Sequence, residues 1–163
     1  MTPRIEFVET EPRWRRALPA RKLAREAVAA AARETNVQCA RGAEMTIHLV
    51  DDARIRELNK TWRGKDAPTN VLSFPAAPAA RLGSAKLLGD VFVALQTLER
   101  EAADEGKPLA DHYRHLALHG FLHLIGYDHE TPGEAEAMEA LETRALARLG
   151  VADPYAGTEL AAP

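Results

Sequence analysis

The chain has 163 residues, of which 46% are hydrophobic and 28% are charged, as is typical of one globular domain. This composition excludes collagen-like, disordered and disulfide-scaffold proteins. No apolar run approaches the roughly 18 residues of a membrane span, and the N-terminus has no apolar signal segment. Cys39 is the only cysteine. We therefore expect a cytoplasmic protein without a membrane partner, in which Cys39 is a buried or half-buried structural residue.

Charge is divided unevenly along the chain. Residues 1–86 carry a net charge of +6, and residues 87–163 carry −9. This asymmetry, with its basic stretch over residues 13–25, indicates either a polyanionic partner or differently charged solvated faces. The total charge of −3 argues against strong non-specific binding of nucleic acid. An RNA ligand would therefore need a local positive groove or a partner such as the ribosome.

Hydrophobic periodicity divides the chain into short strands and amphipathic helices. In chain order we expect a strand over 4–8, a helix over 20–34, a strand over 44–50, a helix capped by Asp51 or Asp52, strands over 71–74 and 87–94, and helices over about 95–105, 108–125 and 133–149. Gly89 and Asp90 mark a bulge or a sheet edge in the last strand.

The element order β-α-β-α-β-β-α-α-α predicts an α+β fold with a small mixed sheet covered by helices. We expect these elements to form one domain over residues 1–150. A flexible tail is expected over residues 151–163, which contain Pro, Ala and Gly.

The expected helix over 108–125 carries four of the six histidines. His119 and His123 are four residues apart, so they share one helix face with Cβ atoms about 5–6 Å apart. At that spacing both imidazoles can reach one metal ion. Gly126 can end the helix in the left-handed conformation, and His129 can then close the site from a loop. Three histidine ligands leave a fourth position open, as in catalytic zinc sites.

The spacing His-x3-His-x2-Gly-x2-His is that of the zincin-like metal helix of metzincin proteases. Those enzymes place a glutamate directly after the first histidine as general base. This chain has Gly120 at that position, which argues against a peptidase. Gly120 either leaves space beside the metal for a nucleotide or lets the helix pack closely on the sheet.

The remaining polar residues near the motif leave several interpretations open. His115 is a rival ligand, a partner of a ligand, a phosphate contact or a hydrogen-bonded histidine beside the core. His112 and His48 are expected at the surface. Asp128 and Glu130 are each placed to orient a ligand imidazole or to accept a proton. We favour a structural role for Asp128 and a helix-start charge for Glu130.

Two further motifs accompany the histidines. The segment 58–75 reads Leu-Asn-x-x-Trp-Arg-Gly-Lys-Asp-x-Pro-Thr-Asn-Val-Leu-Ser-Phe-Pro, and 88–91 reads Leu-Gly-Asp-Val. With these motifs, residues 44–145 resemble the YbeY family of zinc-dependent endoribonucleases, which mature ribosomal RNA in bacteria. The family's usual continuation is present in residues 136–142. Two departures, at the segment 111–115 and in the tail after 150, touch no expected ligand.

The resemblance implies a metal helix that lines a cleft, with one Zn²⁺ per chain held by His119, His123 and His129. It also implies a functional role for Arg63. A planar guanidinium can bind phosphate through two hydrogen bonds, so we expect Arg63 to be the catalytic residue that stabilises phosphoryl charge. Imidazole also binds nickel, copper or iron, so other divalent metals stay possible. The general base is left open.

The sequence thus predicts a zinc-dependent endoribonuclease specific for single-stranded RNA, with a role in small-subunit ribosomal RNA 3′-end maturation and ribosome quality control implied by the resemblance. Its expected partners are ribosomal RNA and the ribosome or ribosomal proteins. One alternative is a metal hydrolase acting on a peptide or an ester. Another is a non-catalytic ribosome assembly factor with a structural zinc, which needs a fourth ligand such as His115 or Asp128.

Overall fold

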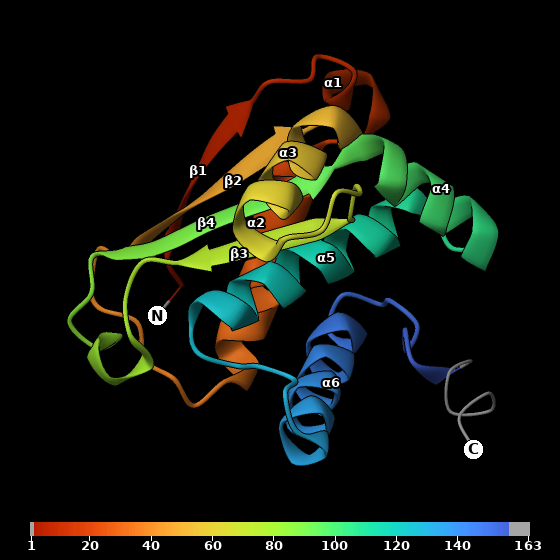
Figure 1. Ribbon diagram of the computed structural model, residues 1–163. Coiled ribbons are helices and arrows are strands. Elements are labelled where there is room, and N and C mark those ends of the chain that lie inside the picture. The colour runs from red at the N-terminus through yellow and green to blue at the C-terminus, as the bar shows by residue number, and fades with distance from the viewer. Residues whose placement is uncertain (1, 157–163) are drawn as a thin grey trace.

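The computed structural model describes residues 2–156, which form one α+β domain around a four-stranded sheet (Figure 1). The strands are β1 (Arg4–Glu9), β2 (Glu44–Val50), β3 (Val71–Pro75) and β4 (Leu87–Ala94), in the spatial order β1-β2-β4-β3. β1 and β4 both run parallel to β2, and β3 runs antiparallel to β4. The predicted mixed sheet is therefore confirmed, with β1 and β3 at its edges.

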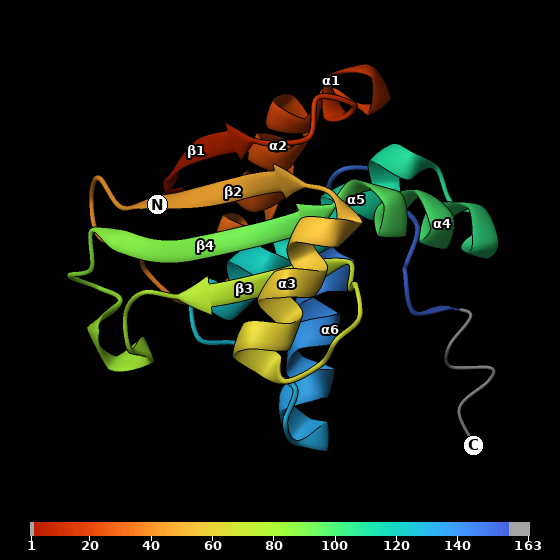
Figure 2. The same ribbon diagram turned by 45° about the horizontal axis from the view of Figure 1, so that its top comes forward.

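Helices cover both faces of this sheet. They are α1 (Trp14–Ala17), α2 (Ala20–Glu34), α3 (Asp52–Arg63), α4 (Leu95–Glu105), α5 (Leu109–Leu124) and α6 (Pro132–Ala147), together with the 3-10 turn η1 (Ala79–Arg81). α2 and α5 lie on one face, with α6 packed beyond them, and α3 crosses the other face toward the β3 edge (Figure 2). The sequence missed only the two shortest elements, α1 and η1. No described helix combines the length and apolar character that crossing a membrane would require.

The alternation of side chains along the strands explains how helices pack on both faces of the sheet. In β2, the side chains of Met45, Ile47 and Leu49 are buried against α2 and α5, whereas the side chain of His48 points to the opposite face. A smaller apolar cluster on that opposite face seats α3 through Ile55 and its neighbours. The sheet consequently has a thick helical layer on one side and a single helix on the other.

The ends of α3 follow from two local signals. Asp51 is the N-cap, and its carboxylate accepts a hydrogen bond from the backbone N–H of Arg54 at 2.8 Å. Gly64 ends the helix in the left-handed conformation, with φ of 72°. The last turn of α3 therefore places Arg63 beside the edge strand β3.

Gly89 marks the predicted bulge, since the register of β2 and β4 shifts there. The interpretation of β4 as an edge is wrong because β4 pairs with β2 on one side and β3 on the other. Gly89 has φ of 134°, and a Cβ at this position would lie 2.2 Å from the carbonyl oxygen of Phe74. Glycine is thus required where β4 passes β3.

Gly120 is the point of closest approach between α5 and the sheet. A Cβ at Gly120 would lie 2.6 Å from Cγ1 of Val91 in β4. The interpretation that Gly120 opens space beside a metal is therefore wrong, and close helix–sheet packing is its role.

The C-terminal segment turns back after α6. Val151 is buried, and the hydroxyl of Tyr155 contacts Glu142 of α6 and His115 of α5. Residues 157–163 of the predicted flexible tail lie outside the described residues, so the flexibility of the tail stays a prediction. Cys39 is half-buried, as predicted.

Replacing Gly120 with alanine should lower the free energy of unfolding by about 1–3 kcal/mol, because the stiff Val91 side chain has to move. Urea denaturation measures this change. The control is Gly133→Ala in α6, where an added Cβ meets no atom within 4 Å. A Gly120→Ala protein as stable as this control would contradict the packing role.

Candidate metal centre

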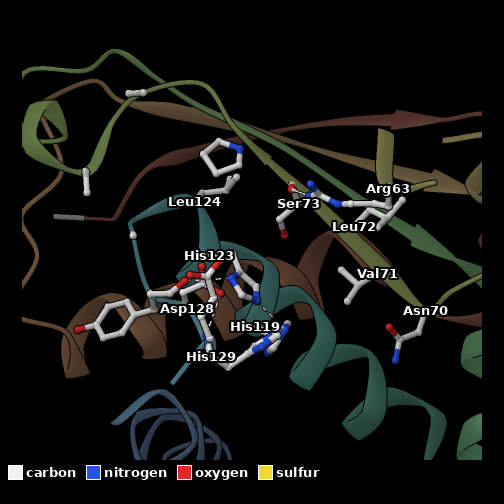
Figure 3. A pocket seen from close by; sticks show the side chains of 16 residues that line it. Arg63, Asn70, Val71, Leu72, Ser73, His119, His123, Leu124, Asp128 and His129 are labelled. Atoms are coloured by element: carbon white, nitrogen blue, oxygen red, sulfur yellow. Dashed lines mark hydrogen bonds between the residues drawn. The ribbon is translucent and has the colours of Figure 1, made fainter. Parts of the chain in front are cut away.

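Three histidines meet where α5 ends. His119 and His123 lie one turn apart on α5, and their Nε2 atoms are 3.1 Å apart. His129 approaches from the loop after α5, with its ring centroid 5.1 Å from that of His123 (Figure 3). One nitrogen of each residue lies within 4.8 Å of the other two, so the three could hold one metal ion. Gly126, with φ of 99°, turns the chain between the helix and His129, as the sequence predicts.

Hydrogen bonds fix which ring nitrogens carry protons. Nδ1 of His123 lies 2.9 Å from the backbone carbonyl oxygen of Tyr127. A carbonyl oxygen only accepts, so this Nδ1 donates and the Nε2 of His123 keeps its lone pair. Nδ1 of His119 lies 2.6 Å from Oε2 of Glu142 and donates in the same way.

When both rings are neutral, the lone pairs of the two Nε2 atoms therefore face each other across 3.1 Å. Without a proton or a cation between them, such an arrangement is repulsive. Two nitrogens on a tetrahedral zinc, with Zn–N bonds of about 2.0–2.1 Å, stand roughly 3.3 Å apart. The donor set and its spacing thus fit a metal ion of this kind.

The protonation state of His123 also suits a ligand. Burial and the neighbouring imidazoles of His119 and His129 lower the pKa of His123 to about 4. His123 is therefore neutral near neutral pH, which is the form that binds metals.

Glu142 in α6 contacts the histidines of α5 from the neighbouring helix. Its carboxylate is fully buried and receives hydrogen bonds from His119, His115 and the hydroxyl of Tyr155. Burial alone would raise the pKa of Glu142, but the hydrogen bonds from His115 and His119 outweigh it and hold the pKa at about 2. Glu142 is thus an ionised carboxylate that orients His119.

His115 is accounted for by this contact. Its Nε2 lies 3.1 Å from Oε1 of Glu142, so among the open interpretations it is the hydrogen-bonded histidine beside the core. His115, His119 and Glu142 form a second group whose spacing could hold a metal. Because Nδ1 of His119 donates to the Glu142 carboxylate, hydrogen bonding already explains the short distances within that group.

Two other histidines, His112 and His48, were both expected at the surface. The prediction of a surface position for His112 is wrong: its side chain is buried, with Nε2 2.8 Å from Glu101 of α4. The packing of α4 on α5 covers it, which no local pattern indicates. His48 does point away from the main core, as predicted, where it stacks on Phe92 and hydrogen-bonds Asp90.

The loop after α5 owes its shape to backbone and side-chain contacts. Oδ1 of Asp128 accepts a hydrogen bond from the backbone N–H of His129 at 2.8 Å, which supports the structural role expected for Asp128. The hydroxyl of Tyr127 lies 2.8 Å from Oγ1 of Thr35, so the loop is tied to the end of α2. Glu130 precedes Thr131, whose hydroxyl caps α6.

A cleft of about 710 Å³ opens in front of the histidines. Its opposite wall is the edge strand β3 with Arg63 (Figure 3). The guanidinium of Arg63 donates to the carbonyl oxygen of Ser73 at 3.0 Å and lies 5.2 Å from the centre of the Phe74 ring. It makes no ion pair with any described residue. The structure thus brings Arg63 and the three predicted ligands to one cleft.

Ser73 and the basic stretch 13–25 have no part in the chemistry of the cleft. The hydroxyl of Ser73 donates to the carbonyl oxygen of Gly120 at 3.2 Å, so it is not activated as a nucleophile. The basic stretch 13–25 does not line the cleft. Within it, Arg13 and Arg15 pair with glutamates, and Arg21 and Arg25 lie over the ring of Phe7. This supports the interpretation as a solvated face.

The family model described as "Endoribonuclease YbeY" matches residues 10–150. A protein of that name from Rhodopseudomonas palustris strain BisA53 is 50% identical over 162 residues, covering 98% of this chain and 94% of the relative. Its namesake from Nitrobacter winogradskyi is also 50% identical over 162 residues, covering 97% and 85%.

A solved structure shares the fold. The solution structure of TM1509 from Thermotoga maritima superimposes with a TM-score of 0.56 and 23% sequence identity. The match covers 90% of this chain and 91% of that one. This likeness concerns the architecture of the two chains alone.

Acidification should destabilise the protein through Glu142. Its pKa is lower in the folded chain than in the unfolded chain, so its stabilising contribution is complete above about pH 4.5 and is lost as the pH falls toward 2. The shift corresponds to about 3 kcal/mol of unfolding free energy.

Urea denaturation between neutral and acidic pH checks this expectation. Glu142→Gln should be less stable than the unsubstituted protein near neutral pH and should lose less stability on acidification. Glu136→Gln, at an exposed position of the same helix, is the matched control. Identical pH profiles for Glu142→Gln and the unsubstituted chain would rule out this role.

Proposed function

The chain belongs to the YbeY family of endoribonucleases, and on that premise we propose that it is a zinc-dependent endoribonuclease specific for single-stranded RNA. The family name supports an endoribonuclease that acts on RNA. We extend the proposal to the maturation of the small-subunit ribosomal RNA 3′ end and to ribosome quality control in the cytoplasm. Its partners would then be ribosomal RNA and the ribosome or ribosomal proteins.

The observation that carries the metal proposal is the 3.1 Å separation of the Nε2 atoms of His119 and His123, whose Nδ1 atoms are already engaged as donors, with His129 alongside. We assign the metal to these three residues, as one Zn²⁺ per chain. When bound, zinc supplies a Lewis acid and lowers the pKa of a bound water to about 7. The residues of the chain have the task of holding it: Glu142 and the Tyr127 carbonyl keep two of the imidazoles in the ligating tautomer.

Arg63 is proposed as the catalytic cation. Cleavage of a phosphodiester bond adds negative charge to the phosphoryl oxygens in the transition state. Arg63 is anchored by the Ser73 carbonyl and the Phe74 ring, so its remaining N–H groups are held on one side of the cleft. A pre-oriented guanidinium loses little freedom when it binds phosphate.

The shape of the cleft supports an unpaired strand as substrate. Its volume of about 710 Å³ lies within the range of pockets that enclose small ligands. A short unpaired segment can enter such a cleft and place one phosphate between the histidines and Arg63. A duplex presents its phosphates on a wide, rigid surface and cannot follow the cleft in this way.

The alternatives are less well supported by the geometry. A peptidase needs a carboxylate base beside the first histidine, but Gly120 occupies that position and Glu142 already accepts three hydrogen bonds. A structural zinc needs a fourth ligand. In the described residues, His115 bonds Glu142 and Asp128 bonds the backbone of its own loop. Neither belongs to the group of His119, His123 and His129 whose ligand atoms all lie within 4.8 Å of one another, which favours an open coordination position.

Metal-dependent cleavage is the first prediction of this proposal. The zinc-loaded protein should cut a labelled single-stranded RNA, and a His119→Ala/His123→Ala variant purified in parallel should not. Chelation should abolish cleavage, and added Zn²⁺ should restore it. Equal cleavage by both proteins would indicate a contaminating nuclease. No cleavage by either would favour the assembly-factor alternative.

Arg63→Ala should keep the zinc content of the unsubstituted protein but cut RNA about 100-fold more slowly, as expected when one transition-state donor is lost. Metal analysis and single-turnover cleavage measure the two properties separately. Arg63→Lys should recover part of the rate because the charge remains while the planar donor pair is lost. Cleavage by Arg63→Ala at the unsubstituted rate would refute the assignment.

A further inference from the structure

Four aromatic rings form a continuous row on the sheet face that carries α3. Trp62 meets Phe74 edge-on with 6.3 Å between ring centroids, and Phe74 meets Phe92 at 5.7 Å. Phe92 stacks on His48 at 4.1 Å. We call this row the outer aromatic cluster. It lies on the opposite side of β3 from the histidines, because β3 side chains alternate between the two faces.

Trp62 is the exposed end of the cluster. Its relative exposure is 65%, whereas the only other tryptophan, Trp14, is fully buried and donates its Nε1–H to the Val50 carbonyl. A single exposed apolar residue is common on protein surfaces. Trp62 differs because its ring is backed by Phe74, which leaves a supported planar surface open to a ligand.

Several positively charged residues are close to Trp62 in the sequence. Lys60 and Lys65 are exposed and lie within three residues of Trp62 in the sequence, as does Arg63. None of the three forms an ion pair within residues 2–156. The nearby carboxylate of Asp66 is paired with Arg56 instead. The flanking charge is therefore available to a polyanion.

Arg63 connects the surface to the cleft. Its guanidinium lies over the same Phe74 ring that supports Trp62, and its side chain also lines the cleft with the histidines. α3 runs toward the β3 edge (Figure 2), so the last turn brings Trp62 and Arg63 to that edge together. A strand whose phosphate contacts Arg63 can thus continue past the edge and onto Trp62.

We propose that Trp62, supported by Phe74, is a stacking subsite for an unpaired RNA base next to the nucleotide held in the cleft. Lys60 and Lys65 contact the phosphates of the nucleotide whose base stacks on Trp62. Base stacking on an aromatic ring requires no particular base, which suits an enzyme that accepts varied single strands. The proposal rests on the proposed function for its ligand, since it takes single-stranded RNA as the substrate.

A protein partner fits this surface less well. The exposed apolar area is a single indole flanked by cations, whereas apolar docking sites form wider continuous patches. The remaining rings of the cluster are partly covered, and His48 is paired with Asp90. The combination of one accessible ring and unpaired cations favours a nucleotide.

Tryptophan fluorescence tests the proposal directly. In a His119→Ala/His123→Ala background, which prevents cleavage, a short single-stranded RNA should quench the emission of Trp62. Trp62→Phe leaves only buried Trp14, so its emission should not respond. A full-length Trp62→Ala chain should bind the RNA about tenfold more weakly, and Trp62→Phe should bind nearly normally. Lack of quenching, or normal binding by Trp62→Ala, would overturn the subsite.

An RNA with one abasic position separates stacking from general effects. The abasic position replaces the nucleotide next to the one held in the cleft. It should weaken RNA binding about tenfold in the protein that keeps Trp62, but it should leave RNA binding by Trp62→Ala unchanged. Equal losses in both proteins would show that Trp62 does not contact the base and would leave a protein partner as the occupant of the surface.

Failure of the proposed function and failure of the stacking subsite give different experimental results. If the enzyme does not cut RNA, the quenching and the abasic effect still report on the subsite. If it cuts RNA but Trp62→Ala has an unchanged KM and unchanged binding, only the subsite is wrong. Trp62→Leu, which keeps apolar contact with Phe74, should match Trp62→Ala in RNA binding. Thermal unfolding verifies that each variant is folded.

Discussion

The buried carboxylate of Glu142 is the constraint on which the candidate metal centre depends. A charge without solvent is tolerated only when donors surround it, and here His115, His119 and Tyr155 supply them. These donors come from α5 and from the segment after α6, so satisfying one carboxylate fixes how three parts of the chain meet. The same interaction decides which nitrogen of His119 faces the cleft.

Helix–sheet distance is the second requirement of this geometry. α5 approaches β4 so closely at Gly120 that no Cβ fits against Val91. That approach turns the neighbouring His119 away from the sheet and toward the cleft, because adjacent helical residues point in different directions. A glutamate at this position, as in the metzincin motif, is incompatible with such packing. Gly120, which argues against a peptidase, thus also allows α5 to pack closely on the sheet.

The sequence predicted those features that depend on neighbours along the chain. The spacing of His119 and His123, the turn at Gly126 and the strand over 44–50 all follow from local periodicity or backbone preference. Glu142 and the buried position of His112 were missed because they depend on how separate helices pack. Such contacts leave no periodic trace in one sequence, although Glu142 lies within the segment 136–142 that resembles the family.

Arg63 shows how the edge strand joins two surfaces that would otherwise be independent. One of its N–H groups donates to the backbone of β3, and its guanidinium lies over the Phe74 ring, 5.2 Å from the ring centroid. Phe74 of the outer aromatic cluster therefore contacts a cation that also lines the cleft. The same Phe74 ring meets Trp62 edge-on, with 6.3 Å between the ring centroids. Contacts through the Phe74 ring thus connect the exposed Trp62 surface with the Arg63 cation that lines the cleft.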